Sequence, residues 1–181
     1  TTREMVFISL MSASLFVINL VIGGAINAAT GIPLSSAFFT AITIGIWSML
    51  MFKMVPKPGT FTLLLLIYSI LEIPTSLGGA PGFWPKVPIN VITGLAGDIF
   101  LYFTRYKDWS IYPAFYLLTT ANLVVFMLFM FLLNVPGTDK LISIAHIMIG
   151  SYWVIGTIGL IFGKIIYKRI ANKRIVRQIN D

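Results

Sequence analysis

The sequence of 181 residues has no cysteine, a single histidine and few charged residues. The absence of cysteine excludes disulfide scaffolds and thiolate metal sites. One histidine argues against haem ligation by paired histidines and against a His-Glu-x-x-His zinc site. Charged residues make up 10% of the chain, against about 25% in ordinary soluble domains. A soluble enzyme of this size needs more polar surface than that, so a soluble enzyme is excluded.

Sequence motifs for enzymatic activity are also missing. The chain has no glycine-rich phosphate loop and no Gly-x-Ser-x-Gly nucleophile turn. Six Asp and Glu residues are too few to support a proton relay across the membrane. We therefore expect no catalytic residues, no metal and no cofactor in this chain.

Long apolar runs dominate what is present, because 57% of the residues are hydrophobic. A membrane-spanning helix needs about 20 mostly apolar residues. Turn residues such as Val135-Pro136-Gly137 separate the runs. The pattern predicts an all-α membrane protein, a six-transmembrane-helix bundle forming one integral membrane domain over residues 1–181. The expected helices cover residues 5–26, 33–52, 58–77, 85–104, 111–133 and 141–167.

The positions of the basic residues predict the orientation. Most of the 13 Lys and Arg residues fall at one side of the expected bundle, including Arg3, Lys57, Arg105 and the basic tail 168–181. Short cytoplasmic loops carry such an excess. We therefore expect a multi-pass protein of the cell membrane with both termini cytoplasmic. The net charge of +7 then indicates contact with lipid headgroups and not with nucleic acid.

Polar residues inside the apolar stretches predict a binding site, because an ionisable group in a bilayer usually has a function. Glu72, Asn90 and His146 lie at similar expected depths of roughly 6–9 Å below the outer surface, at 1.5 Å per residue. Residues spaced by three or four extend these positions into stripes. The prediction is an outward-facing pocket with Trp153 as its floor and Trp84 on a loop above it. The expected substrate-binding residues are Glu72, Tyr68, Trp84, Lys86, Asn90, His146, Trp153 and Asn27.

Structural roles are the alternatives for the same residues. Glu72 can form an ion pair with Lys86, and His146 can bond a neighbouring helix. Asp98 lies in the inner half of its helix, so a packing or conformational role is expected, with Arg105 or Asn122 as its partner.

Small residues spaced by four allow helices to approach closely. Ser9 and Ala13 have this spacing in the first stretch, and Gly159 and Gly163 have it in the last. Either pair serves internal packing or forms a docking face for another membrane protein.

Several motifs together resemble the substrate-binding S components of energy-coupling factor (ECF) transporters, and within them the YkoE-type hydroxymethylpyrimidine/thiamine-precursor permease group. The motifs are Val55-Pro56-Lys57-Pro58-Gly59, Leu71-Glu72, Gly94-Leu95-Ala96-Gly97-Asp98 and Thr104-Arg105-Tyr106-Lys107. The resemblance is clearest over about residues 45–120.

The resemblance implies capture of a thiamine-like or pyrimidine compound on the outer side of the membrane. It also implies docking on an ECF transmembrane coupling subunit that carries two ATPase subunits, with Ser9 and Ala13 in the place of the family's paired alanines. A membrane scaffold or assembly protein without a ligand is the main alternative. A lipid-modifying enzyme and a stand-alone channel are the others.

Overall fold

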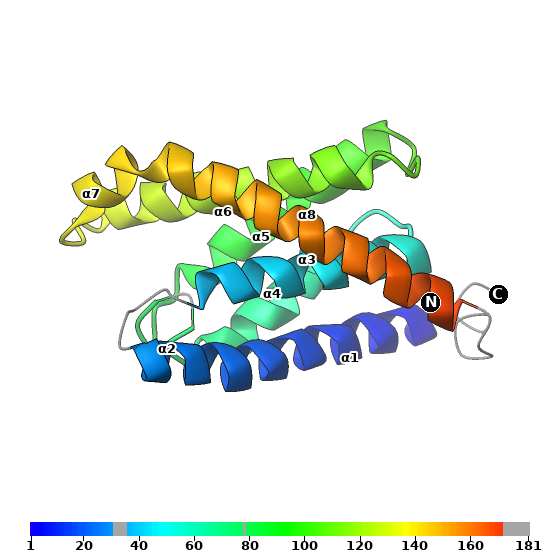
Figure 1. Cartoon of the computed structure of the whole chain (residues 1–181), viewed down its shortest axis with the longest axis horizontal. Coiled ribbons are helices and arrows are strands. Elements are labelled where there is room, and N and C mark those ends of the chain that lie inside the picture. The colour runs from blue at the N-terminus through cyan, green and yellow to red at the C-terminus, as the bar shows by residue number, and fades with distance from the viewer. Residues whose placement is uncertain (31–35, 78, 172–181) are drawn as a thin grey trace.

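The computed structural model describes residues 1–30, 36–77 and 79–171, and this part of the chain contains helices and no strand (Figure 1). The elements are α1 (Thr2–Ile18), a π-helical segment η1 (Asn19–Gly23), α2 (Gly24–Thr30), α3 (Ala37–Met54), α4 (Thr60–Glu72), α5 (Lys86–Phe103), α6 (Ile111–Leu132), α7 (Thr138–Ser143) and α8 (Ala145–Ile170). Two predicted features, the start of the second stretch at Pro33 and most of the basic tail, lie outside the described residues.

Within the described ranges, five helices are long and apolar enough to cross a membrane, and α1, η1 and α2 together form one of them. The all-helical prediction is therefore confirmed, but the count of six spans is not. The third expected span, 58–77, is the 13-residue helix α4, which ends at Glu72. At 1.5 Å per residue it is about 20 Å long, short of the roughly 30 Å of a bilayer core. Pro74 follows closely and has no backbone N–H to continue the helical hydrogen bonds, which accounts for the early end.

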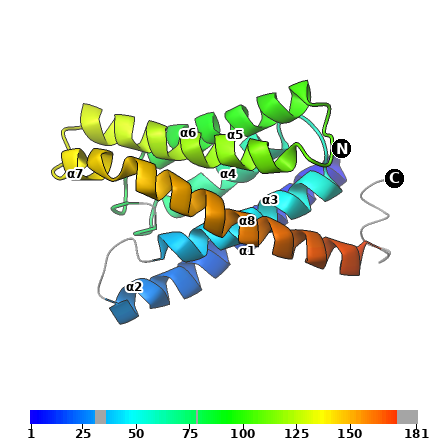
Figure 2. The same ribbon diagram turned by 45° about the horizontal axis from the view of Figure 1, so that its top comes forward.

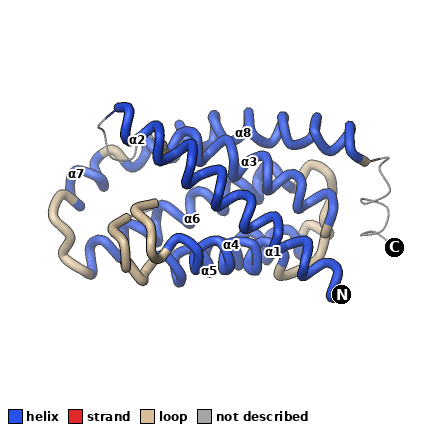
Figure 3. Tube along the Cα trace, turned by 90° about the horizontal axis from the view of Figure 1, so that it is seen from below, coloured by secondary structure: helices blue, strands red, loops and turns tan. Residues whose placement is uncertain are grey.

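The helices form a closed ring. In order around the ring, α1 packs on α4, α4 on α5, α5 on α6, α6 on α8, α8 on α3, and α3 on α1 and η1. Figures 2 and 3 show the helices from two further directions, with α7 and the loop before α5 at one end. The start of α1 and the end of α8 lie together at the opposite end (Figure 1).

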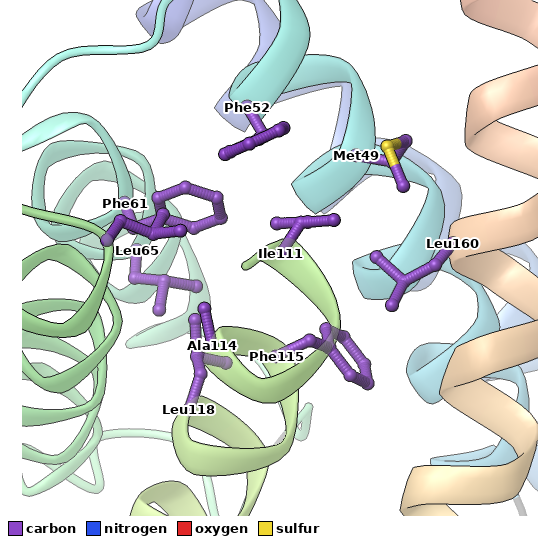
Figure 4. Packing of buried hydrophobic residues seen from close by; sticks show 10 residues of the cluster. Met49, Phe52, Phe61, Leu65, Ile111, Ala114, Phe115, Leu118 and Leu160 are labelled. Carbon is purple, nitrogen blue, oxygen red and sulfur yellow. The ribbon is translucent and has the colours of Figure 1, made fainter. Parts of the chain in front are cut away.

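The ring is filled with side chains in the half nearer the start of α1. There the main core combines residues of five helices, among them Phe52, Phe61, Leu101, Phe115 and Leu160 (Figure 4). These residues come from the last turns of α3 and α5, from the first two turns of α4 and α6, and from the middle of α8. This core does not fill the other half of the ring, where the same helices enclose a cavity.

Apolar side chains also cover much of the outer surface. Leu10, Val21, Phe103 and Val154 are each more than 60% exposed. Soluble monomers rarely expose contiguous apolar surface on this scale. The outer surface is thus suited to lipid, as the sequence predicted.

Candidate ligand-binding site

A cavity of about 190 Å³, here called the main cavity, lies in the half of the ring that the core leaves open. A water molecule needs only about 10–15 Å³ on this scale, so the main cavity has room for a small organic molecule. Its lining comes from the first turns of α3 and α5, the last turns of α4 and α6, and from α7 and α8. The lining residues with polar side chains are Ser36, Thr40, Tyr68, Glu72, Lys86, Asn90, Asn122 and Tyr152.

Glu72 is the acidic residue of this lining. It is the last residue of α4 and is only 6% exposed. Tyr68, Lys86 and Asn90 line the same cavity. Tyr68 precedes Glu72 by one helical turn, so both side chains point to the same side of α4. The expected grouping of Tyr68, Glu72 and Asn90 is thus present around one cavity.

Lys86 has a different role from the expected ion pair. Its ammonium group donates hydrogen bonds to the backbone carbonyl oxygens of Glu72 at 3.0 Å and Thr75 at 2.8 Å. No Glu72–Lys86 ion pair is present in the ranges that the structure describes. A cation favours the C-terminal end of a helix, where carbonyl groups lack helical partners. Lys86, although it lines the main cavity, therefore caps α4.

We expect Lys86→Met to lower the free energy of unfolding by about 1.5–3 kcal/mol, the usual contribution of hydrogen bonds to a charged group. The reason is that the substitution leaves the carbonyl oxygens of Glu72 and Thr75 without the hydrogen bonds that Lys86 donates. Thermal unfolding of the purified protein in detergent measures the change. Lys107→Met is the control, because Lys107 is exposed, and equal unfolding temperatures for the two variants would contradict the capping role.

Asn90 and Asn122 separate the main cavity from a smaller one. The amide nitrogen of Asn122 lies 3.5 Å from the Asn90 side-chain oxygen and 3.3 Å from the Thr93 hydroxyl. Beneath them is a second cavity of about 60 Å³, the inner cavity, which shares Asn90, Asn122 and Tyr152 with the first. Both distances are near the upper limit for hydrogen bonds. The Asn122 amide is consequently free to exchange these contacts for a ligand.

Trp84 and Asn27 lie outside the cavity linings. Trp84 is exposed before α5 and packs edge-to-face against Phe129 of α6. The Asn27 side-chain oxygen accepts a hydrogen bond from the backbone N–H of Ser36 at 3.0 Å. That bond joins α2 to the residue before α3. Asn27 therefore makes a structural contact with Ser36, which lines the main cavity.

His146 and Trp153 were expected on the pocket-facing side of the last helix, and neither lines a cavity. His146 is exposed. The indole nitrogen of Trp153 donates to the Thr120 hydroxyl at 3.1 Å, and its ring lies 5.2 Å from that of Tyr116 on α6. The expectation placed the wrong face of α8 toward the cavity. Met148 and Tyr152 line the main cavity instead, and Ile149 lines the inner cavity.

Several lining residues were missed by sequence reasoning. They are apolar or aromatic residues of α3, α6 and α8, such as Ile44, Leu123, Phe126 and Tyr152. Only Asn122 had a recognisable signal, a polar amide in the middle of an apolar stretch. The others look like any lipid-facing residue in the sequence.

Asp98 binds neither Arg105 nor Asn122, the partners expected from sequence. Its carboxylate accepts hydrogen bonds from the backbone N–H groups of Phe61 at 3.1 Å and Thr62 at 2.8 Å, and from the Thr62 hydroxyl at 2.6 Å. These groups belong to the first turn of α4, where N–H groups lack helical partners. Asp98 therefore caps the N-terminus of α4, which agrees with a packing role and corrects the partner.

Gly159 and Gly163 form an internal contact and not a docking face. A Cβ atom on Gly159 would lie 2.2 Å from the carbonyl oxygen of Ile42, and one on Gly163 would lie 2.7 Å from that of Ile46. Both carbonyl groups belong to α3, so these glycines let α8 lie directly on the α3 backbone. On α1, Ser9 is exposed and its hydroxyl bonds the Met5 carbonyl, while Ala13 is half-buried. The docking role of Ser9 and Ala13 stays a prediction.

Metal ligands are not grouped in the described part of the chain, where no three His, Cys, Asp or Glu residues come together. The main cavity combines one carboxylate and two amides with largely apolar walls, a composition common in sites that bind small organic molecules.

The chain matches a protein family whose description names no activity. No curated protein and no solved structure matches the chain. The family called Trep_Strep, described as hypothetical bacterial integral membrane proteins, matches residues 2–141. This range carries every lining residue of the main cavity except Met148 and Tyr152. Because the match spans most of the sequence, the chain belongs to the Trep_Strep family of bacterial integral membrane proteins.

Proposed function

We propose that the protein is the substrate-capture subunit of an ECF-type vitamin importer in the cell membrane. The cargo is thiamine or a thiamine precursor such as hydroxymethylpyrimidine. In this proposal the chain is not an enzyme. It docks through Ser9 and Ala13 of α1 on a coupling subunit, and two partner ATPase subunits hydrolyse ATP.

The carboxylate of Glu72 in the main cavity is the observation that carries the proposal. A buried carboxylate beside the Asn90 amide offers both hydrogen-bond acceptors and a donor. That combination suits the amino group and ring nitrogens of an aminopyrimidine, and the negative charge suits a thiazolium cation. Tyr68, Phe126 and Tyr152 supply aromatic rings in the same lining, and rings of this kind attract a cationic ligand by about 0.5–2 kcal/mol.

The orientation of the chain supports capture from outside. The main cavity lies at the end of the ring away from the start of α1. Arg3 lies at the start of α1 and Lys168 near the end of α8, while Lys53 lies in the last turn of α3 and Lys57 follows it and bonds Glu4 of α1. With that end cytoplasmic, the cavity faces the outer side, which is where an importer meets its cargo.

The test is a binding measurement by isothermal titration calorimetry on the purified protein in detergent. The compounds are thiamine, hydroxymethylpyrimidine, riboflavin, biotin and pyridoxine. We expect submicromolar binding of thiamine or hydroxymethylpyrimidine and a rise of the unfolding temperature with the same compound. Submicromolar binding of one of the other three would keep the importer role and change the cargo. No binding by the folded protein would favour the scaffold alternative.

Glu72→Gln should weaken binding of that compound at least tenfold, which is about 1.4 kcal/mol. The substitution keeps the size of the side chain and removes its charge. Glu4→Gln is the matched control, because Glu4 bonds Lys57 and the N-terminus at the opposite end of the molecule. Equal affinities for the two variants would remove Glu72 from the site.

A scaffold protein without a ligand is the second candidate, and the exposed apolar face of α1, with Met5, Leu10 and Val17, favours it. The packing of Gly159 and Gly163 against α3 counts against it, because it removes one of the two faces on which that function would depend.

A further inference from the structure

The inner cavity is small and has mostly apolar walls. Its volume is about 60 Å³, whereas a water molecule needs about 10–15 Å³ on this scale. The apolar residues of its lining are Ala41, Ile44, Leu65, Leu118, Leu123 and Ile149. Cavities with apolar walls tend to stay dry and to bind small apolar molecules. The inner cavity therefore has room for an apolar group of a few heavy atoms.

The two cavities meet at a set of shared residues, here called the junction. The junction residues come from α3, α5, α6 and α8, and they are Ile44, Asn90, Asn122, Leu123 and Tyr152. Four residues that line the inner cavity and not the main one are each less than 5% exposed: Ala41, Leu65, Thr93 and Leu118. A group that enters the inner cavity from the main cavity passes between the junction residues.

Asn122 is held at the junction by long contacts. Its amide nitrogen lies 3.5 Å from the Asn90 side-chain oxygen and 3.3 Å from the Thr93 hydroxyl, whereas N–H···O hydrogen bonds are usually about 2.9–3.0 Å long. Thr119 of the same helix shows the contrast, because its hydroxyl bonds two carbonyl oxygens of α6 at 2.9 and 3.1 Å. Movement of the Asn122 amide therefore costs little, and the amide gains a better hydrogen bond if a ligand supplies an acceptor.

The proposed cargo carries a substituent that suits this arrangement. In hydroxymethylpyrimidine and in thiamine, a methyl group stands on the ring carbon between the two ring nitrogens. The nitrogens accept hydrogen bonds, and the amino group beside one of them donates. Side-chain amides of asparagine are donors, so Asn90 and Asn122 can bind the ring nitrogens on either side of the methyl group. The amino group is then left for the Glu72 carboxylate in the main cavity.

We propose that the inner cavity is a subsite for a short alkyl substituent of the ligand, and that Asn122 controls the entry to it. The Asn122 amide leaves Asn90 and Thr93 for an acceptor atom of the ligand, and the alkyl group fills the apolar space behind the junction. The ligand class is a hydrogen-bonding heterocycle that carries a short alkyl group. The inference rests on the proposed function in taking a ring bound at Glu72 as the ligand.

The test fills the inner cavity after the protein has folded, which the absence of cysteine from the sequence makes possible. Ala41→Cys places one thiol in the inner cavity. Methyl methanethiosulfonate converts this thiol into a methyl disulfide, with methanesulfinate as the leaving group. Intact mass spectrometry of the purified protein in detergent measures the rate. We expect Asn122→Ala to raise the rate at least tenfold, because the amide then no longer covers the entry.

Gly150→Cys provides the control thiol. Gly150 is exposed on α8 and lines neither cavity, and a Cβ atom there meets no other atom within 4 Å. The reagent should modify this thiol at the same rate whether or not Asn122 is present.

The second measurement compares the affinities of hydroxymethylpyrimidine and its analogue without the ring methyl group, by isothermal titration calorimetry. One carbon more or less in a fitted apolar pocket changes affinity about 10–200-fold. Unmodified Ala41→Cys should therefore bind the methylated compound at least tenfold more tightly. After modification the preference should disappear, because the methylthio group occupies the subsite. Modified Gly150→Cys should keep the preference.

The outcomes separate this inference from the proposed function. An Ala41→Cys thiol that does not react, or that reacts equally fast with and without Asn122, would overturn the entry past Asn122. A methyl preference that survives modification would overturn the subsite, and the importer role would stand. If neither compound binds the unmodified protein, the proposed cargo is wrong. The labelling rates then still decide whether the inner cavity admits a small apolar group past Asn122, since the reagent itself delivers one.

Discussion

Asp98→Ala is expected to lower the free energy of unfolding by about 2–6 kcal/mol, because it leaves two buried backbone N–H groups without acceptors. Asp98 is 4% exposed and accepts three hydrogen bonds from the first turn of α4. Without it, the N–H groups of Phe61 and Thr62 lose their acceptors, and each unsatisfied buried group costs about 1–3 kcal/mol. The loss of an anion at the positive end of α4 acts in the same direction.

Thermal unfolding in detergent measures this effect, and Asp108→Ala provides the comparison. The Asp108 side chain is 86% exposed and bonds Lys53 at 2.7 Å. Exposed ion pairs contribute about 0–1 kcal/mol. The unfolding temperature should therefore fall much further for Asp98→Ala than for Asp108→Ala. Comparable decreases would show that Asp98 does not hold α4.

Gly159→Ala should also lower the free energy of unfolding, because the added methyl group clashes with the backbone of α3. The added Cβ atom would lie 2.2 Å from the Ile42 carbonyl oxygen, which belongs to a helix backbone and cannot rotate away. Overpacking of a tight contact costs about 1–3 kcal/mol, and more where the backbone must move. Since α3 and α8 also hold the main cavity between them, we expect ligand affinity to fall together with stability.

Gly150→Ala is the matched control on the same helix. A Cβ atom at Gly150 meets no other atom within 4 Å. Alanine is favoured over glycine inside a helix by about 1 kcal/mol, so this variant should be as stable as the wild type or slightly more stable. The difference in unfolding temperature between the two variants measures the α3–α8 contact. Indistinguishable variants would mean that the helices are not packed at this distance.

Sequence reasoning identified Tyr68, Glu72 and Asn90 because polar groups are conspicuous in apolar stretches. It failed on α8, where apolar residues cover all sides of the helix. Such a helix has no amphipathic pattern that separates the lipid face from the interior. The face was therefore chosen from His146 and Trp153, and the packing against α3 instead turns Tyr152 toward the cavity.

Lys86 and Asp98 illustrate a second limit of predicting contacts from the sequence. The sequence marked both as buried charges, and side-chain partners were sought for them. The structure pairs each with backbone groups of another helix. Every helix end offers such groups, but which end lies beside which charge depends on tertiary packing. The early end of α4 at Glu72, which creates the site for Lys86, was missed, because the sequence prediction continued this span past Pro74 to residue 77.

The two caps on α4 have a consequence for how the protein is made. The N-terminal end of α4 is held by Asp98 and the C-terminal end by Lys86, and both belong to α5. Helix α4 is too short to cross the bilayer core alone, and its helical ends are satisfied by a segment synthesised after it. We therefore expect α4 to become stable in the membrane only once α5 has been synthesised, so that the two helices insert as one hairpin.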